Sequence, residues 1–407
     1  MQGPLLRRLL IGVALVVSLN LTPTVAQASP LQLHPMSISF PTPRLGYLLS
    51  LYKCDGKTCA ALRSTHDAGS SWNMVATPSR MNNDLNLISW GTYGTEYAYS
   101  TINVHFADAQ NGWIYGSVPT PDAANPSNPI WVSRLWSTHD AGKTWQKIPL
   151  RPLSLTGGVV QMATHGSWTY LFGGSNTNGR TYILTTPSNV DRWTDDSSAQ
   201  MGMPAGGTQL QGEFSFTGST GLFVAGNDRG FTASARLSKD GSWIFWKGPS
   251  FEAFGASFAP IATVTRKVLL AEGESSGFVI PPASTVPPEW NSSSSWLFIS
   301  YNAGATFKPL RELSSSYHRG YFSVPGLPAT PEPGTILLQQ TTNTSLKLVQ
   351  STDWGRTWNV VLNRPVSQVV FTTRSKGFAI VRHGTVQSDT SLFVTDDEGG
   401  HWSRVIV

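Results

Sequence analysis

The sequence predicts an all-β fold, a single seven-bladed β-propeller of four-stranded antiparallel blades, because one eight-residue phrase recurs seven times. The phrase, called the box, has a small hydroxyl residue followed by Asp two, Gly four, a hydroxyl six and an aromatic residue seven positions later. Clear copies occupy 65–72, 138–145 and 351–358, near copies 300–307 and 395–402, and weaker copies 186–193 and 238–243. An internal repeat of this period indicates a solenoid or a propeller.

Each box has the composition of a tight β-hairpin turn. Its hydroxyl and its carboxylate can bond the backbone of the turn, its glycine permits a positive φ, and its aromatic ring can pack between strands. Because the acidic group would be used inside its own turn, we interpret it as structural and not catalytic. His66 and His139, at variable box positions, are expected to face solvent. The structural box residues are Asp67, Asp140, Asp240, Asn302, Asp353 and Asp397.

A second repeated phrase places the strands between the boxes. Phe40, Phe106 and Phe371 are each followed six positions later by Gly, and Phe216 five positions later. Apolar runs of β character follow this phrase and lead into the box, which predicts a unit of four strands, a to d. The second phrase is then the a–b turn and the box the c–d turn. Box starts lie 44 to 73 residues apart, which fits four-stranded blades with insertions.

The ends of the chain predict how the ring closes. The first a strand can begin near Met36, and the last d strand ends at Val407. Each blade is therefore expected to come from one continuous stretch. Blades 1 and 7 would close the ring by side-chain packing, with no strand exchanged between the chain ends.

The first residues have the pattern of an export signal. Arg7 and Arg8 precede an apolar run, and Ala26-Gln27-Ala28 is a small-residue cleavage site. We expect residues 1–28 to be a signal peptide and residues 29–407 to be the propeller, secreted or extracytoplasmic after cleavage behind Ala28. The apolar run is short for a permanent membrane span, so no membrane insertion is expected after cleavage. A retained signal would instead give a tethered ectodomain.

The charge and cysteine content of the chain indicate which classes of function are favoured. Without Arg7 and Arg8, residues 29–407 have 27 basic and 24 acidic side chains, a net charge too small to favour nucleic acid. Charged residues are 13% of the chain, against roughly a quarter in typical proteins, which suits a secreted β-protein. Cys54 and Cys59 are the only cysteines and flank an Asp-Gly turn, which predicts a disulfide across a hairpin in an oxidising compartment. A metal site is the weaker reading, since no further ligands accompany them.

The longest insertions all fall on the rim opposite the boxes, called the top rim. They are the d–a connections 76–103, 196–211 and 311–320 and the b–c loops 117–131 and 271–296, the last with Glu272 and Glu274. Loops gathered at one end of a rigid scaffold often bind ligands, so the top rim is the predicted recognition surface. Its aromatic side chains could equally pack as plugs of the central channel. The candidate binding residues are Trp90, Tyr93, Tyr97, Trp131, Trp290, Tyr317 and Arg319.

The box pattern resembles the Asp-box family, also called BNR repeats, over nearly the whole of residues 29–407. That family includes sialidases, whose first catalytic arginine lies in a Phe/Tyr-Arg-Ile-Pro motif. The most similar segment of this chain is Pro43-Arg44-Leu45-Gly46, which lies in an a–b turn on the box rim. We therefore assign no sialidase catalytic role to any residue of this chain. A glycosidase needs a pair of carboxyl groups at a defined separation, and the sequence shows no such pair.

The repeat of the second blade resembles the photosystem II assembly and stability factor family. The resembling segments are Phe106 to Trp113 (FADAQNGW) and Leu135 to Trp145 (LWSTHDAGKTW). The resemblance implies an exported single propeller that acts as a scaffold. We therefore expect a monomeric, non-catalytic binding module for a protein or glycan at the cell surface, without cofactor or metal. The alternative is a glycoside hydrolase acting at the top rim.

Overall fold

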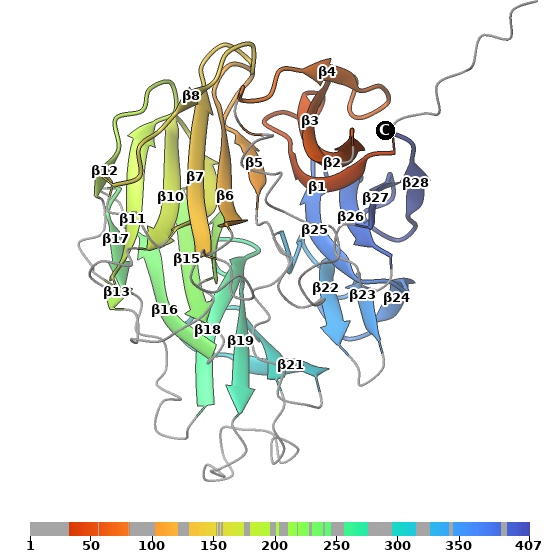
Figure 1. The fold of residues 1–407 in the computed structure, drawn as a ribbon. Helices are drawn as coiled ribbons and strands as arrows, with labels where there is room; N and C mark the ends of the chain where they lie inside the picture. Colours follow the sequence, from red (N-terminus) through yellow and green to blue (C-terminus); the bar gives the residue numbers. More distant parts are fainter. Residues whose placement is uncertain are drawn as a thin grey trace, which may run out of the picture. The chain divides into compact units, whose positions relative to one another are not determined.

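The computed structural model describes residues 32–407 with gaps at 56, 80, 82–101, 121–129, 152, 154, 156–157, 175–179, 196–200, 203–210, 218, 228–229, 239–240, 246–255, 276–294, 315–325, 342–344 and 384–388. The expected signal peptide lies outside these residues. The described elements are β-strands, and they form seven antiparallel sheets, each from consecutive strands. The fold is the predicted seven-bladed β-propeller (Figure 1).

The strands follow the chain blade by blade. Blades 1 to 4 contain β1 (His34–Ser39), β2 (Gly46–Cys54), β3 (Lys57–Thr65) and β4 (Asn73–Val75); β5 (Asn103–Phe106), β6 (Gly112–Thr120), β7 (Ile130–Thr138) and β8 (Gln146–Lys147); β9 (Gly158–His165), β10 (Trp168–Gly174), β11 (Arg180–Pro187), β12 (Thr194–Asp195) and the additional β13 (Met201–Gly202); and β14 (Gln211–Thr217), β15 (Thr220–Asn227), β16 (Gly230–Leu237) and β17 (Trp243–Phe245). Blades 5 to 7 contain β18 (Ala256–Thr263), β19 (Leu269–Ser275), β20 (Ser295–Ser300) and β21 (Lys308–Ser314); β22 (Ile336–Thr341), β23 (Leu346–Ser351) and β24 (Asn359–Leu362); and β25 (Val366–Phe371), β26 (Gly377–Arg382), β27 (Thr390–Thr395) and β28 (Ser403–Val405).

Every box lies at a c–d turn, as predicted, but some strands run further into the top-rim insertions than the sequence suggested. In blade 6, Ala329 forms a bridge to Leu337 of β22 at the place of the first strand. Strand β19 extends to Ser275, so Glu272 and Glu274 belong to a strand and not to a loop. Glu272 is also only 3% exposed.

The box residues bond the turn itself, as their composition predicted. In blade 6 the Ser351 hydroxyl donates to Asp353 Oδ1 (2.8 Å) and accepts from the Gly355 N–H (2.7 Å). The Thr357 N–H and hydroxyl donate to the two oxygens of Asp353 at 2.8 and 2.7 Å. These Thr357 donors hold the pKa of Asp353 at about 2. The carboxylate is therefore ionised and fully used within the turn.

The turn needs two successive left-handed residues, of which the sequence revealed only one. The box glycines have positive φ angles, for example 82° at Gly142. The residue before each of these glycines is also left-handed, although it is never glycine: Ala68, Ala141, Ala303, Trp354 and Glu398 have φ between 57° and 65°. Such a backbone conformation costs about 1 to 2 kcal/mol in a residue with a Cβ. The hydrogen bonds of the box outweigh this strain.

The second phrase has a steric explanation. A Cβ atom added at Gly46 would collide with the Phe40 ring, and one at Gly112 with the Phe106 ring. The phenylalanine at the end of strand a therefore lies over a glycine at the start of strand b. This contact packs the a–b turns of blades 1 and 2 and explains the constant spacing of the two residues.

Neighbouring blades are joined by side chains that bond the backbone of the next inner strand. The hydroxyls of Ser37 and Ser39 on β1 accept from the N–H groups of Val104 and Phe106 on β5, at 3.1 and 2.9 Å. Blades 4 and 5 repeat the arrangement, because the Thr263 N–H donates to Ser215 Oγ (3.1 Å). Between blades 6 and 7 a longer side chain makes the corresponding bond: the Val366 N–H donates to Gln339 Oε1 (2.8 Å).

The ring is also closed by a side chain that bonds the backbone of the next inner strand, here through two hydrogen bonds. Gln368 of β25 accepts from the Ile38 N–H through Oε1 (2.8 Å) and donates to the Ile38 carbonyl through Nε2 (2.9 Å). The Thr390 hydroxyl donates to the Pro35 carbonyl (2.6 Å), and Ile38 packs with Phe378 in one apolar cluster. The red strands of blade 1 thus lie beside the blue strands of blade 7 without a shared sheet (Figure 1). The predicted mode of closure is confirmed for the described strands.

The weak box of blade 3 contacts blade 2 through Asp191. Asp191 accepts hydrogen bonds from Trp113 Nε1 (3.1 Å) and the Ser137 hydroxyl (2.7 Å), and it contacts His139 Nε2 at 3.0 Å. His139 Nδ1 lies 2.7 Å from Asn111 Oδ1. His139 is exposed, as expected, and it also bridges two blades.

We predict that Asp353→Ala lowers the melting temperature clearly, whereas Asp353→Asn lowers it little. Blade 5 has Asn at this position: Asn302 accepts the Thr306 N–H (2.9 Å), and its Nδ2 donates to Thr306 Oγ1 (2.8 Å). Because the folded pKa of Asp353 lies below its ordinary value of 3.8, its stabilisation is complete above about pH 4 and is lost as the pH falls through about 2. Calorimetry from pH 2 to 7 should show this loss in the wild type and a smaller one in the Asn variant. Equal melting of the Ala and Asn variants at pH 7 would contradict the prediction.

We predict that Gln368→Ala destabilises the ring by about 1 to 3 kcal/mol, because the Ile38 N–H and carbonyl lose their partners. Chemical denaturation measures the loss, and amide exchange at Ile38 should accelerate. Ser367→Ala is the matched control, since the Ser367 hydroxyl bonds only within its own blade, to the Ile380 carbonyl. An unchanged exchange rate at Ile38 in Gln368→Ala would show that the amide does not close the ring.

Candidate recognition surface

The predicted top-rim residues lie almost entirely outside the described part of the chain. Trp131 is on β7, where its backbone pairs with Pro119, and nothing is described of its side chain. Their grouping into one surface stays a prediction. The remaining candidates, all outside the described residues, are Trp90, Tyr93, Tyr97, Trp290, Tyr317 and Arg319.

One described part of the top rim lies at the junction of blades 7 and 1. Strands a begin and strands b end on this rim, because the a–b turns and the boxes share the other one. The starts of β1 and β25 and the ends of β2 and β26 therefore lie together. These positions bring basic side chains to one place, called the seam cluster: His34, Lys53, Arg364 and His383, with Asp389 as its acidic member.

Hydrogen bonds fix the blade 7 half of the seam cluster. Arg364 Nη1 donates to His383 Nδ1 (2.7 Å), because a guanidinium can only donate. His383 must then hold its proton on Nε2, which donates to the Ser391 hydroxyl (2.8 Å). The His383 N–H also bonds the Asp389 carbonyl (2.8 Å). The side chain of Arg364 is exposed, so its guanidinium is held at the surface.

The blade 1 half of the seam cluster is coupled to blade 7 by charge. Burial lowers the pKa of His34, the carboxylate of Asp389 raises it, and the ammonium of Lys53 lowers it. These effects require the three side chains to lie near one another across the seam. Lys53 is exposed, and Asp389 is the one acid that acts on His34. The cluster is therefore a surface with excess positive charge.

The predicted disulfide is present beside Lys53. Cys54 and Cys59 are bonded, with Cα atoms 5.9 Å apart, across the turn between β2 and β3. Closure of so short a loop contributes at most about 2 kcal/mol to stability. Its effect is local: it braces the strand end from which Lys53 projects.

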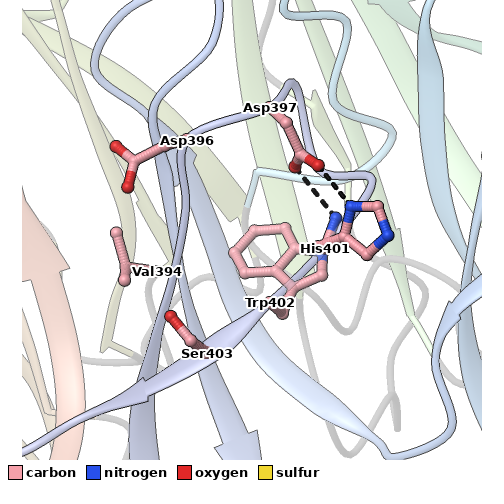
Figure 2. Close-up of a pocket in the computed structure, with 6 residues that line it drawn as sticks. All are labelled: Val394, Asp396, Asp397, His401, Trp402 and Ser403. Carbon is pink, nitrogen blue, oxygen red and sulfur yellow. Dashed lines mark hydrogen bonds and ion pairs between the residues drawn. The ribbon is translucent and has the colours of Figure 1, made fainter.

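A shallow pocket of roughly 330 Å³ lies on the opposite rim, at the box of blade 7 (Figure 2). Asp397 Oδ1 accepts from the His401 N–H (2.9 Å), and Oδ2 meets His401 Nδ1 at 2.5 Å. Burial opposes the ionisation of Asp397, but the His401 donors hold its pKa at about 2. Asp396 pairs with Lys376 at 3.4 Å. Both carboxylates are thus engaged within blade 7, and the pocket is a feature of the turn.

The described residues also bear on metal binding and on membrane insertion. No three His, Cys, Asp or Glu side chains among them are grouped so that they could hold a metal ion. Within the same residues, no helix is long and apolar enough to cross a membrane.

No protein-family model matches the chain, and no curated protein matches it. Among solved structures, the chain is similar to YCF48 bound to a D1 peptide, with 16% identity over 90% of this chain and 94% of that chain and a TM-score of 0.51. It is also similar to an ulvan lyase of polysaccharide lyase family PL25, with 10% identity over 89% and 92% and a TM-score of 0.51. The chain is also similar to a puromycin hydrolase, with 12% identity over 91% of this chain and 53% of that chain and a TM-score of 0.53. This chain therefore spans about half of that protein. At such identities these similarities show the fold alone.

Proposed function

We propose that this chain is an exported, non-catalytic scaffold of the Asp-box type that binds a protein partner through its top rim. The observation that supports the proposal most directly is the seam cluster, which holds Arg364 and Lys53 exposed on the rim opposite the boxes. Guanidinium and ammonium groups fixed at a surface bind carboxylates through charge-assisted hydrogen bonds. The partner segment is therefore an acidic peptide.

Three further observations support this proposal. YCF48, whose structure was solved with a D1 peptide, has a similar fold over 94% of its length. The signal-like residues 1–28 and the Cys54–Cys59 bond suit an oxidising, extracytoplasmic compartment. The box carboxylates, which are the repeated acidic groups of the chain, are used inside their turns, as shown for Asp353 and Asp397.

A binding experiment tests the proposed function. Fluorescence anisotropy with a library of short acidic peptides should identify binders, and Arg364→Ala or Lys53→Ala should weaken them about tenfold, a typical effect of losing one charge-assisted bond. Arg356→Ala is the matched control, because Arg356 is also an exposed arginine and lies in the box of blade 6. Its peptide affinity should equal that of the wild type.

Two outcomes would contradict the proposal. Equal losses of affinity in Arg364→Ala and Arg356→Ala would mean that the attraction is only the net charge of the protein. Turnover of a fluorogenic glycoside panel, with no peptide bound, would favour the hydrolase alternative.

A further inference from the structure

The side chain of Arg364 is held by a histidine that accepts its hydrogen bond only while the ring is neutral. Arg364 Nη1 lies 2.7 Å from His383 Nδ1, and because a guanidinium only donates, this nitrogen carries a lone pair. The proton of the ring is then on Nε2, which donates to the Ser391 hydroxyl at 2.8 Å. Ser391 is only 4% exposed, so this second bond fixes the ring from the protein side.

The backbone on both sides of this contact belongs to the sheet of blade 7. The Arg382 N–H donates to the Pro365 carbonyl (2.9 Å), which continues the pairing of β25 with β26 toward the top rim. Arg364 and His383 therefore stand opposite one another. The His383 N–H donates to the Asp389 carbonyl (2.8 Å), which continues the pairing of β26 with β27. A change at the imidazole ring thus moves the Arg364 side chain and leaves the strands in place.

Few charges adjoin the His383 ring. Strands β22, β24, β25 and β27 and residues 384–388 have no ionisable side chain. Among the described residues, the charged group bonded to the ring is the Arg364 guanidinium. A second proton on His383 therefore meets a cation directly. The titratable residues of the other adjoining segments are His34, Lys53, Lys347, Arg382 and Asp389.

We propose that His383 is a proton-operated gate on Arg364, the exposed arginine of the seam cluster. Histidine gains its positive charge as the pH falls from about 8 to 5. The ring then takes a proton from solvent on Nδ1, because that nitrogen has the lone pair. Two positively charged N–H donors now face one another, so the hydrogen bond to Arg364 is lost. The guanidinium is released, and His383 Nδ1 becomes a donor beside it.

The gate regulates the capture of an acidic peptide, a consequence that rests on the proposed function of the seam cluster. While His383 is neutral, it occupies one N–H donor of Arg364. Once His383 is protonated, the cluster has one more positive charge, and all the donors of Arg364 are free. A carboxylate then binds to Arg364 and His383 together through charge-assisted hydrogen bonds. Binding of an acidic segment therefore tightens in acid and takes up a proton.

NMR of the arginine side chains tests the gate without any partner. In the wild type, the heteronuclear NOE of Arg364 Nε should show an ordered side chain at pH 8 and a mobile one at pH 5.5. His383→Asn should keep Arg364 ordered at both pH values, because the amide oxygen takes the place of Nδ1 and does not titrate. His66→Gln is the matched control, since His66 is an exposed histidine on the box rim, and it should switch like the wild type. Equal order of wild-type Arg364 at both pH values would overturn the gate.

A second arginine is an internal reference if His383→Asn does not fold. Arg311 Nη2 donates to Gln340 Oε1 (2.9 Å), an acceptor that does not titrate. In the wild type, the order of Arg311 should stay constant between pH 8 and 5.5 while that of Arg364 falls. A parallel loss of order at both arginines would mean that acid loosens the whole protein, and it would refute the gate.

A peptide measurement separates the gate from the proposed function. The probe is rhodamine-labelled hexa-aspartate, whose carboxylates are ionised at pH 5.5 because their pKa is about 4. Fluorescence anisotropy should show about tenfold tighter binding to the wild type at pH 5.5 than at pH 8, the effect of one further charge-assisted hydrogen bond. His383→Asn should bind equally at both pH values. Because His34 is present in both proteins, their difference isolates His383.

The two hypotheses fail in different ways. A release of Arg364 in acid, with no peptide bound at either pH, would support the gate and contradict the proposed binding of acidic segments. Peptide binding that tightens equally in the wild type and in His383→Asn would support the binding surface and refute its regulation by His383.

Discussion

The propeller depends on partners for the backbone groups along the inner edge of each blade. An inner strand pairs with its second strand on one side only, so its other edge presents N–H and C=O groups that need acceptors and donors. Side chains of the neighbouring blade supply them: a serine hydroxyl at Val104 and Thr263, a glutamine amide at Val366 and Ile38. Bonds of this kind let seven separate sheets close into a ring. A strand shared between the chain ends is then unnecessary.

The sequence predicts best what is decided within a few residues. The box supplies its own donors and acceptors over eight positions, so its recurrence gives the number of blades and the place of each c–d turn. Features that depend on another blade are not predictable in this way. Asp191 accepts a hydrogen bond from Trp113 of the neighbouring blade, and His139 contacts the same carboxylate. The only sequence signal of this contact between blades is that the box of blade 3 lacks the usual carboxylate. The left-handed Ala141 has no sequence signal, because hydrogen bonds around it and not its own preference set its φ.

From the sequence, the proposed recognition surface could be assigned only to a rim. The period of the blades assigns each insertion to one end of the ring, but the aromatic residues in those insertions have no repeated partner that fixes their position. The seam cluster was missed for a different reason. His34 and Arg364 come from opposite ends of the chain, and ring closure alone brings them together. The signal that could have found them is the blade period itself, since both residues stand at the start of an inner strand.

The two rims differ in what their polar groups have left to bind. On the box rim, carboxylates such as Asp353 are saturated by their own turns. On the top rim, His383 occupies one of the five N–H donors of Arg364. A partner that contacts Arg364 and Lys53 bridges blades 7 and 1, where the ring is closed by side chains such as Gln368. Because binding to the folded state alone stabilises it, such a partner also strengthens closure. Recognition and ring stability are then coupled at the same seam.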